Sequence, residues 1–274
     1  MSEKREFPVA FVTGASRGIG RASALALAEA GFDVVVTART LVEGETADGR
    51  PLPGSIASTA SEVRKRGREA LPLPLDLLDS DSMIAAVDTT RREWGGIDLL
   101  LNNGIYTGEG NMLRVLELPP GEIETIFRAN VFAPTALVQA ILPEMQERGS
   151  GCIINMVSAA GQSDPPAPAR EGGWGYAYGA SKGAIERMAG VLAVEHPGPG
   201  LSFFNVEPGF VMTEAMHLND PDGELQKRAQ GAPPSVPAAV VAWLATDPGA
   251  RKWNGQTISA QPFALEHRLH PDWR

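Results

Sequence analysis

The sequence predicts an α/β fold, a doubly wound parallel sheet covered by helices on both faces. Seven short apolar runs alternate with longer amphipathic stretches, and the runs are mostly apolar instead of alternating in polarity. Continuous apolar runs are typical of parallel strands that are buried on both faces. The alternation of such runs with helical patterns is typical of successive βαβ units.

The expected elements follow from these patterns. The strands are expected at Val9–Val12, Val34–Val36, Leu71–Leu75, Ile97–Leu101, Cys152–Ile154, Leu201–Val206 and Thr257–Ser259. The helices are expected at Gly20–Ala30, Ser55–Arg66, Asp81–Trp94, Glu122–Met145, Tyr178–Glu195 and Val236–Thr246. Leu41–Gly54 and Gln162–Gly175 are rich in glycine and proline, which disfavour the interior of helices and central strands, and are expected to be loops.

The composition indicates one packed globular domain over residues 1–274, because no repeat or linker divides the chain. The net charge of −9 argues against nucleic acid or an anionic membrane as a partner. The start lacks the apolar core of a signal peptide, and no segment approaches the roughly 20 apolar residues that span a bilayer. The lone Cys152 is expected to be buried in a reducing compartment, so we expect a cytoplasmic protein.

A glycine-rich turn, Thr13–Gly20, follows the first predicted strand and leads directly into a helical run. Its glycines permit a tight turn and the close approach of a pyrophosphate, which free N–H groups at the helix N-terminus would bind. Turns of this kind also occur without a ligand, so the segment alone does not decide between a dinucleotide site and a tight connection.

Tyr178 and Lys182 are four residues apart at the start of a predicted helix, which puts both side chains on one face. A tyrosine that transfers protons near neutral pH needs its pKa lowered by ~3 units, or ~4 kcal/mol. A lysine charge at ~5 Å would supply ~3 kcal/mol, and an oxidised nicotinamide ring the remainder. Tyr176 lacks such a partner, because Ala180 stands four residues later. The alternative is a pair of surface neighbours.

With both motifs in this order, the chain resembles the short-chain dehydrogenase/reductase family over about residues 8–262. The long connection after the second strand is similar to a subgroup of hydroxysteroid dehydrogenase-like proteins. The resemblance implies a Rossmann fold and NAD(P)-dependent interconversion of an alcohol and a ketone or aldehyde by hydride transfer. It also implies a substrate loop at about residues 210–235.

The resemblance further implies four catalytic residues. Asn130 would hold a proton-relay water, and Ser158 would orient the substrate oxygen. Tyr178 would be the general acid and base, with Lys182 lowering its pKa and binding the nicotinamide ribose. The resemblance also implies that Asp76 contacts the adenine and that Val211 and Thr213 contact the nicotinamide carboxamide. The full set of implied cofactor-binding residues is Gly14, Ser16, Arg17, Gly18, Ile19, Gly20, Asp76, Leu77, Asn103, Gly104, Tyr178, Lys182, Pro208, Gly209, Val211 and Thr213.

The second predicted strand is followed by Arg39, with no carboxylate where an NAD enzyme would bind the ribose hydroxyls. Arg39 and Arg17 together suit a 2′-phosphate, so NADP is the expected cofactor and NAD the alternative. The competing interpretation is that both arginines are solvated surface residues.

The family resemblance leaves the substrate unnamed. Trp174, Phe210 and Met216 are the expected substrate contacts, which favours an apolar substrate. Trp174 lies in a segment that makes the spacing from Ser158 to Tyr178 about seven residues longer than is usual in the family. We expect this segment to form a wall of the substrate pocket, the alternative being that Trp174 packs against a neighbouring subunit or fills a gap in the fold.

The four histidines show no metal-ligand spacing, so no metal is expected. The resemblance and the two long helices favour a homotetramer. Two other functions stay open: a catalytically inactive NADP-binding scaffold or sensor, and a nucleotide-sugar epimerase or dehydratase. An intact tetrad argues against the first, and the short stretch between Met212 and Pro237 argues against the second.

Overall fold

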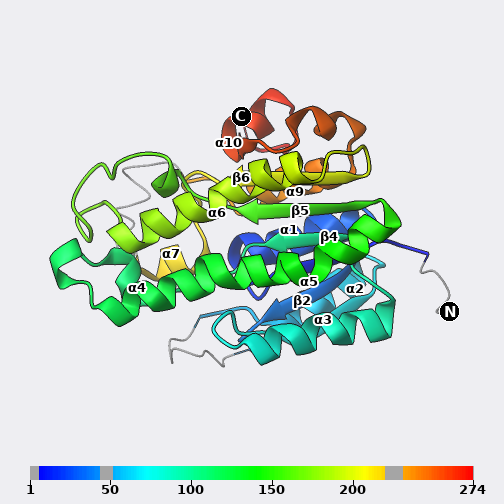
Figure 1. Cartoon of the computed structure of the whole chain (residues 1–274), viewed down its shortest axis with the longest axis horizontal. Helices are drawn as coiled ribbons and strands as arrows, with labels where there is room; N and C mark the ends of the chain where they lie inside the picture. The colour runs from blue at the N-terminus through cyan, green and yellow to red at the C-terminus, as the bar shows by residue number, and fades with distance from the viewer. Residues whose placement is uncertain (1–5, 44–51, 220–230, 274) are drawn as a thin grey trace.

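A seven-stranded parallel sheet forms the centre of the computed structural model, which describes residues 6–43, 52–219 and 231–273 (Figure 1). The strand order is β3-β2-β1-β4-β5-β6-β7, so the winding direction reverses between β1 and β4. The strands are β1 (Val9–Thr13), β2 (Asp33–Ala38), β3 (Ala70–Pro74), β4 (Leu99–Asn102), β5 (Gly151–Met156), β6 (Leu201–Glu207) and β7 (Thr257–Ser259). The predicted fold class and all seven predicted strands are confirmed.

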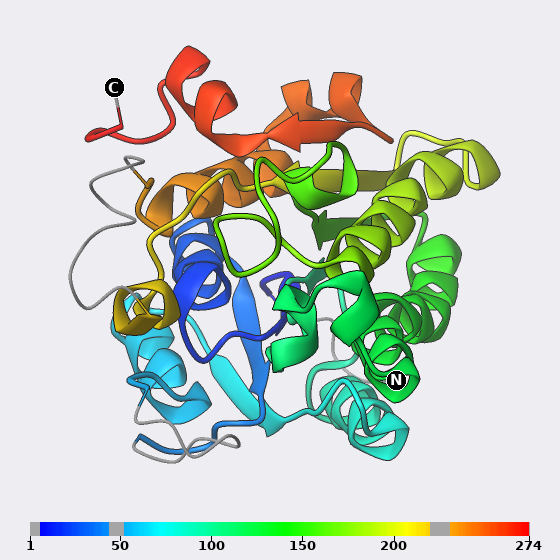
Figure 2. The same cartoon turned by 90° about the vertical axis from the view of Figure 1, so that its left-hand side faces the viewer.

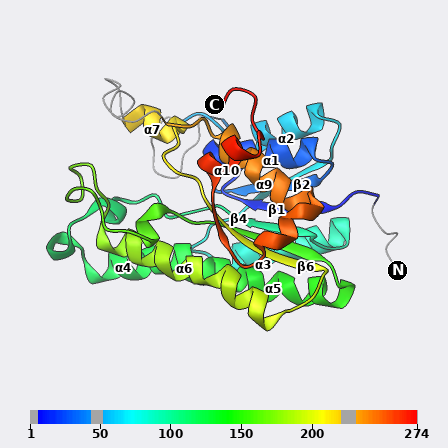
Figure 3. The same ribbon diagram turned by 90° about the horizontal axis from the view of Figure 1, so that it is seen from above.

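Helices cover both faces of the sheet, which explains why the strands are apolar throughout (Figure 3). The helices are α1 (Gly18–Glu29), α2 (Ile56–Lys65), α3 (Ser80–Trp94), α4 (Pro120–Phe127), α5 (Ala133–Arg148), α6 (Tyr176–Glu195), α7 (Glu214–Asn219), α9 (Ser235–Thr246) and α10 (Ala260–Glu266). Alternate strand residues serve the two cores: Val12 packs with α1 and α9, whereas Phe11 packs with α3 and α5.

The six predicted helices are present, with two differences. The predicted helix Glu122–Met145 is interrupted by a π-helical turn, η3 (Arg128–Phe132), between α4 and α5. The short helices α7 and α10 were not expected, because each has fewer than two full turns in which a periodic pattern could be recognised.

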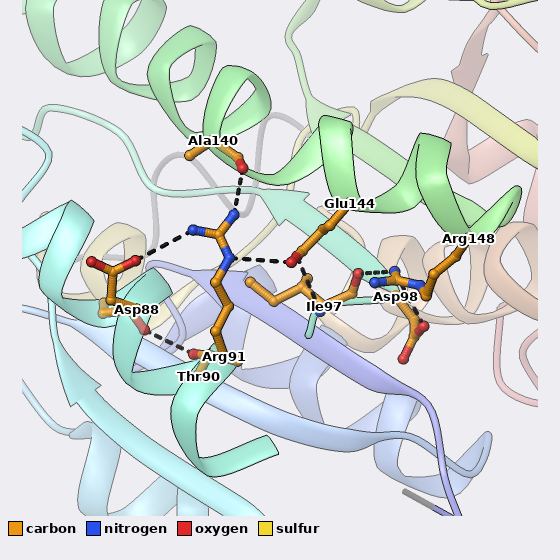
Figure 4. Close-up of polar contacts among 9 residues, drawn as sticks. Asp88, Thr90, Arg91, Ile97, Asp98, Ala140, Glu144 and Arg148 are labelled. Carbon is orange, nitrogen blue, oxygen red and sulfur yellow. Dashed lines mark hydrogen bonds and ion pairs between the residues drawn. The ribbon is translucent and has the colours of Figure 1, made fainter. Parts of the chain in front are cut away.

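Half-buried polar contacts join helix α5 to α3 and to the chain before β4 (Figure 4). Arg91 of α3 donates through Nε to Glu144 Oε2 at 3.1 Å and through Nη2 to the Ala140 carbonyl. Glu144 Oε1 accepts the Ile97 N–H at 3.3 Å, and Arg148 donates to the Ile97 carbonyl. These contacts fix α5, and with it the π-helical turn at its start, against α3 and the strand that follows Ile97.

The continuous helical stretch Pro120–Arg148 has 29 residues, and the mean hydropathy of its most apolar 18-residue window is 1.3, enough by length and composition to cross a membrane. The expectation that no segment reaches that level is therefore wrong. Half of its most apolar window is buried inside the protein, as in the core helices of globular folds. The apolar character of this stretch follows from its contact with the sheet.

Of the expected loops, Gln162–Gly175 has neither helix nor strand and is closed by an isolated bridge between Ala169 and Gly173. In Leu41–Gly54, residues 44–51 lie outside the described residues, as do residues 220–230 of the expected substrate loop. Cys152, expected to be buried, is half-buried near the start of β5. Figure 2 looks onto the end of the molecule at which α4, α7 and the loop before α6 gather.

Candidate active site

The glycine-rich turn between β1 and α1 has the backbone that a bound pyrophosphate requires. Gly14 and Gly18 have φ angles of +67° and +57°, which side-chain-bearing residues rarely adopt. A Cβ on Gly20 would lie 2.2 Å from the Gly14 carbonyl oxygen. Arg17 precedes α1 without a side-chain cap, and the first N–H group of the helix, that of Gly18, is bound by the Glu214 carboxylate.

A cleft of about 230 Å³ opens beside this turn, at the switch point of the sheet where α/β folds bind ligands. Its walls come from the ends of β1, β2, β3 and β4, and from the start of α7. Of the predicted cofactor residues it is lined by Gly14, Ser16, Arg17, Gly18, Arg39, Asp76, Leu77, Asn103, Gly104 and Thr213. The shape of the cleft and its position at the N-terminus of α1 fit the phosphates and adenosine of a dinucleotide.

Asn103 acts on the glycine turn itself. Its Nδ2 donates to the carbonyls of Thr13 and Gly14 at 2.9 and 3.3 Å, and its N–H donates to Thr13 Oγ1 at 2.9 Å. The Gly104 N–H donates to the same hydroxyl, and a Cβ on Gly14 would lie 2.8 Å from the Gly104 Cα. Asn103 and Gly104 therefore fix the conformation of the turn from the neighbouring strand.

The two arginines predicted to bind a 2′-phosphate, Arg17 and Arg39, differ in their surroundings. Arg39 is exposed on the cleft wall, and its Nη2 makes a long contact of 3.4 Å with Thr107 Oγ1. Arg17 donates to the carbonyls of Pro53 and Gly54 at 2.9 and 2.8 Å. Arg39 is thus the more available of the two for an anionic group, whereas Arg17 also anchors the chain after β2.

Asp76 and Leu77, predicted to lie near the adenine, follow β3 on the cleft wall. The Asp76 carboxylate accepts the Leu78 N–H at 3.0 Å, and the Asp76 N–H donates to Ser82 Oγ at 3.0 Å. These contacts hold Asp76 in a defined turn at the start of α3.

Asn130 lies within the π-helical turn η3 and is 3% exposed. Its Oδ1 accepts the Tyr106 N–H at 2.9 Å, and its Nδ2 donates to Ser181 Oγ at 3.1 Å. Ser181 in turn donates to the Tyr178 carbonyl at 2.8 Å. Asn130 is therefore joined to the first turn of α6, and a π-helical turn is a frequent feature of functional sites.

Ser158 and Tyr178 meet between the end of β5 and the start of α6. Ser158 begins the short turn η4 (Ala159–Gly161), its Oγ accepting the Ala160 N–H at 3.2 Å. Burial raises the pKa of Tyr178 above its ordinary value of 10, a hydrogen bond with Ser158 acts to lower it, and the Glu207 carboxylate raises it further. The phenol is accordingly protonated at neutral pH.

Lys182 is 4% exposed, and its Nζ donates to the Met156 carbonyl at 2.8 Å. Burial lowers the pKa of this ammonium to about 8. The influences on the pKa of Tyr178 here are burial, Ser158 and Glu207, while the Lys182 ammonium binds the Met156 carbonyl, and the lowering of that pKa by Lys182 stays a prediction.

The Pro208–Thr213 segment leads from β6 back to the glycine turn. Gly209 has a φ of +71°, Val211 is buried, and a Cβ on Gly18 would lie 3.3 Å from Thr213 Cγ2. Glu214, at the start of α7, accepts the Gly18 N–H at 2.9 Å. The predicted cofactor-binding residues of the glycine turn and those of the segment after β6 therefore lie side by side at the first turn of α1.

The three predicted substrate residues lie in different surroundings. A Cβ on Gly179 would lie 3.4 Å from the Trp174 ring, so this half-buried tryptophan packs one residue beyond Tyr178. The Phe210 ring lies beside Gly231, and the Met216 N–H donates to Thr213 Oγ1 at 3.3 Å. Of the three, Trp174 is the one that these contacts place next to the predicted catalytic residue Tyr178.

Sequence reasoning missed a buried row of asparagines. Asn102 Nδ2 donates to Asn155 Oδ1 at 3.0 Å, and Asn155 Nδ2 donates to Asn205 Oδ1 at 3.1 Å, across β4, β5 and β6. Asn205 Nδ2 donates on to the Glu186 carbonyl of α6 at 2.6 Å. The available signal was an asparagine within or ending each of three otherwise apolar strands, where a buried polar group needs a partner.

Known proteins are similar to this chain over most of its length. Residues 8–223 match the family model described as short chain dehydrogenase. The chain is 31% identical over 254 residues to a 3-oxoacyl-[acyl-carrier-protein] reductase of Synechocystis, covering 92% of this chain and 94% of the relative. It is 33% identical over 147 residues to hydroxysteroid dehydrogenase-like protein 2 of Bos taurus, covering 53% of this chain and 33% of that relative.

Solved structures agree with these matches. A short-chain type dehydrogenase/reductase from Mycobacterium marinum superposes with a TM-score of 0.76 at 27% identity, covering 92% of this chain and 93% of that structure. Members of this family are oxidoreductases that use nicotinamide cofactors. The chain belongs to the short-chain dehydrogenase/reductase family.

Proposed function

We propose that the protein interconverts an alcohol and a ketone or aldehyde with NADP as cofactor, and that Tyr178 transfers the proton. The observation that carries this proposal is the meeting of Ser158, Tyr178 and Lys182 where β5 ends and α6 begins. When bound, the nicotinamide would supply or accept the hydride. The relative from Synechocystis, named as a reductase of a 3-oxoacyl group, is consistent with a ketone substrate.

The protein's own residues would perform the proton chemistry. In reduction, the Tyr178 phenol donates a proton to the carbonyl oxygen while Ser158 donates a hydrogen bond to the same oxygen. In oxidation, the Tyr178 phenolate accepts the hydroxyl proton. Lys182 would bind the ribose, and Asn130 would hold the water that reconnects Tyr178 to solvent.

The raised pKa of Tyr178 favours the protonated form at neutral pH, which supports reduction there more than oxidation. Oxidation requires the phenolate, whose fraction grows as the pH rises toward that raised pKa. We therefore propose that the oxidative rate increases with pH across the alkaline range, while the reductive rate is highest below it.

The test is turnover of NADPH or NADP⁺ over a panel of apolar ketones, aldehydes and alcohols, with Tyr178→Phe and Tyr176→Phe compared side by side. Tyr178→Phe removes only the transferable hydroxyl, so it should abolish turnover and leave cofactor binding nearly unchanged. Tyr176→Phe is the matched control at an exposed position in the same turn of α6. Activity of Tyr178→Phe within about tenfold of the parent, a barrier change of only ~1.4 kcal/mol, would refute the assignment.

NADP preference is supported by the exposed Arg39 on the cleft wall. Arg17 supports it less than expected, because its guanidinium also binds the Pro53 and Gly54 carbonyls. A lower KM for NAD than for NADP at matched kcat would contradict the preference.

We also propose a cytoplasmic homotetramer formed by a single-domain chain. Helices α5 and α6 border an apolar groove, and Phe132, Val191 and Val194 on these helices and the preceding turn are exposed. A second copy of the chain could cover this surface. Light scattering that shows a 29.0 kDa species at micromolar concentration would contradict the tetramer.

The second candidate function is a catalytically inactive NADP-binding scaffold, which absence of turnover on the whole panel would favour. Its distinguishing result would be cofactor binding without exchange of hydride on any substrate of the panel.

A further inference from the structure

Gln261 binds the backbone of the Pro-Gly turn after β6. Its Nε2 donates to the Pro208 carbonyl at 3.0 Å and to the Phe210 carbonyl at 2.8 Å, so both of its hydrogens are used on the two residues that flank Gly209. A Cβ on Gly209 would lie 2.4 Å from that same Nε2. The amide therefore lies directly against the turn, and only glycine leaves room for it.

The sheet register brings Gln261 to this place. Glu207, the last residue of β6, pairs with Ser259, the last residue of β7. Two residues beyond each strand, Gly209 and Gln261 lie side by side, as the contact of the Gln261 amide with the turn shows. Gln261 belongs to the first turn of α10, which fixes the direction of its side chain.

The C-terminal segment holds Gln261 from the other side. The Trp273 indole N–H donates to the Gln261 carbonyl at 3.1 Å, and Trp273 itself packs against the core. His270 Nε2 lies 2.9 Å from Ser235 Oγ at the start of α9, which anchors the same segment. The chain after α10 therefore returns to Gln261 and binds its backbone carbonyl through Trp273.

The turn leads directly to residues proposed to bind the nicotinamide. The Met212 N–H donates to the Ala232 carbonyl at 3.0 Å, and the Ala232 N–H donates to the Phe210 carbonyl at 2.9 Å. Phe210 O therefore accepts from both Gln261 and Ala232, and it immediately precedes Val211. A shift of the Phe210 carbonyl would displace Val211 and Thr213 relative to α1.

We infer that Gln261, held by Trp273, is a positioning residue for the nicotinamide half of the cofactor site. This inference rests on the proposed function, because it assigns Val211 and Thr213 to that half. It predicts that the C-terminal segment affects binding of the nicotinamide portion and leaves the adenosine portion alone, since the cleft residues Arg39 and Asp76 lie at the ends of β2 and β3, on the far side of the switch point.

The experiment measures dissociation constants of NADPH and of 2′,5′-ADP, which carries the adenosine half only, by titration calorimetry. Gln261→Met keeps the side-chain length and removes both donors, and Trp273→Phe removes the indole N–H. Gln256→Met is the matched control, because Gln256 donates to the Lys252 carbonyl at an exposed position away from the turn. The melting temperature of each variant is measured in parallel.

The expected result is at least fivefold weaker NADPH binding by Gln261→Met and about twofold weaker binding by Trp273→Phe, with 2′,5′-ADP binding unchanged from the parent throughout. Unchanged NADPH binding by a folded Gln261→Met would overturn the inference, as would equal weakening of both ligands. If Gln261→Met does not fold, Trp273→Phe decides by the same criterion. Failure of the parent protein to bind NADPH or NADH would instead refute the proposed function, and the inference with it.

Discussion

Replacing Lys182 by methionine should stabilise the protein while it removes activity. The Lys182 ammonium is almost completely buried, and it donates to the Met156 carbonyl. Burial lowers its pKa from an ordinary 10.5 to about 8, which means that the folded protein holds the charged form at a cost. Methionine has nearly the same length and no charge to desolvate.

The size of the effect follows from that pKa difference. Below about pH 8 the full difference applies, and at ~1.4 kcal/mol per unit it amounts to about 3 kcal/mol near pH 6.5. Between about pH 8 and 10.5 the unfolded chain binds more protons than the folded protein, so the stability of the parent rises with pH and the cost falls to about 1 kcal/mol near pH 9.5. Losing the hydrogen bond to Met156 costs about 1 kcal/mol at either pH.

The net expectation for Lys182→Met is a gain of about 2 kcal/mol in the free energy of unfolding near pH 6.5 and almost none near pH 9.5. Urea unfolding at the two pH values measures it, with Lys65→Met as control, because the Lys65 side chain is 67% exposed. A destabilised Lys182→Met at the lower pH, or a gain of the same size at both, would show that burial of the ammonium is not the cause.

Three further predictions concern other parts of the molecule. Trp174→Ala should lower kcat/KM more for bulky apolar substrates than for small ones at little change in melting temperature, whereas an equal loss with a drop of several degrees would mean that Trp174 only packs. Arg39→Glu should raise the KM for NADP at least tenfold and change that for NAD much less, and equal changes would contradict a role at the 2′-phosphate. Arg68→Met should lower the free energy of unfolding by about 3 kcal/mol, because it leaves the buried Asp33 carboxylate without the Arg68 guanidinium at 2.6 Å. Adding Asp33→Asn to this variant should restore part of the loss, and urea unfolding of the single and double variants measures both effects.

The elements predicted best are those whose pattern is local. The seven strands were predictable because a short, continuous apolar run between turn residues is typical of a strand buried on both faces. The tight turn at Gly14 and the start of a helix near Tyr178 were predictable because their motifs occupy a few consecutive residues. The π-helical turn at Asn130 was not predictable, since the helical periodicity of Glu122–Met145 continues across it.

Contacts between segments that are far apart in the chain could not be predicted from the sequence. The four-residue spacing of Tyr178 and Lys182 does not tell how deeply the two side chains are buried. Burial raises the pKa of Tyr178, and Lys182 donates to the carbonyl of a residue 26 positions away. The same holds for Arg17, whose position in the glycine turn suggested a phosphate ligand but whose guanidinium also binds the carbonyls of residues 53 and 54. Such contacts are properties of the packed state.

The asparagine row across β4, β5 and β6 limits which amino-acid substitutions this part of the sheet can accept. Each amide serves as donor to the next, so replacing Asn155 alone leaves a buried donor unpaired on one side and a buried acceptor unpaired on the other. A substitution tolerated at one position would require compensation at its neighbours, and the last hydrogen bond of the row, to the Glu186 backbone carbonyl, joins it to α6. The carboxyl edge of the sheet is thus expected to vary as a unit or not at all.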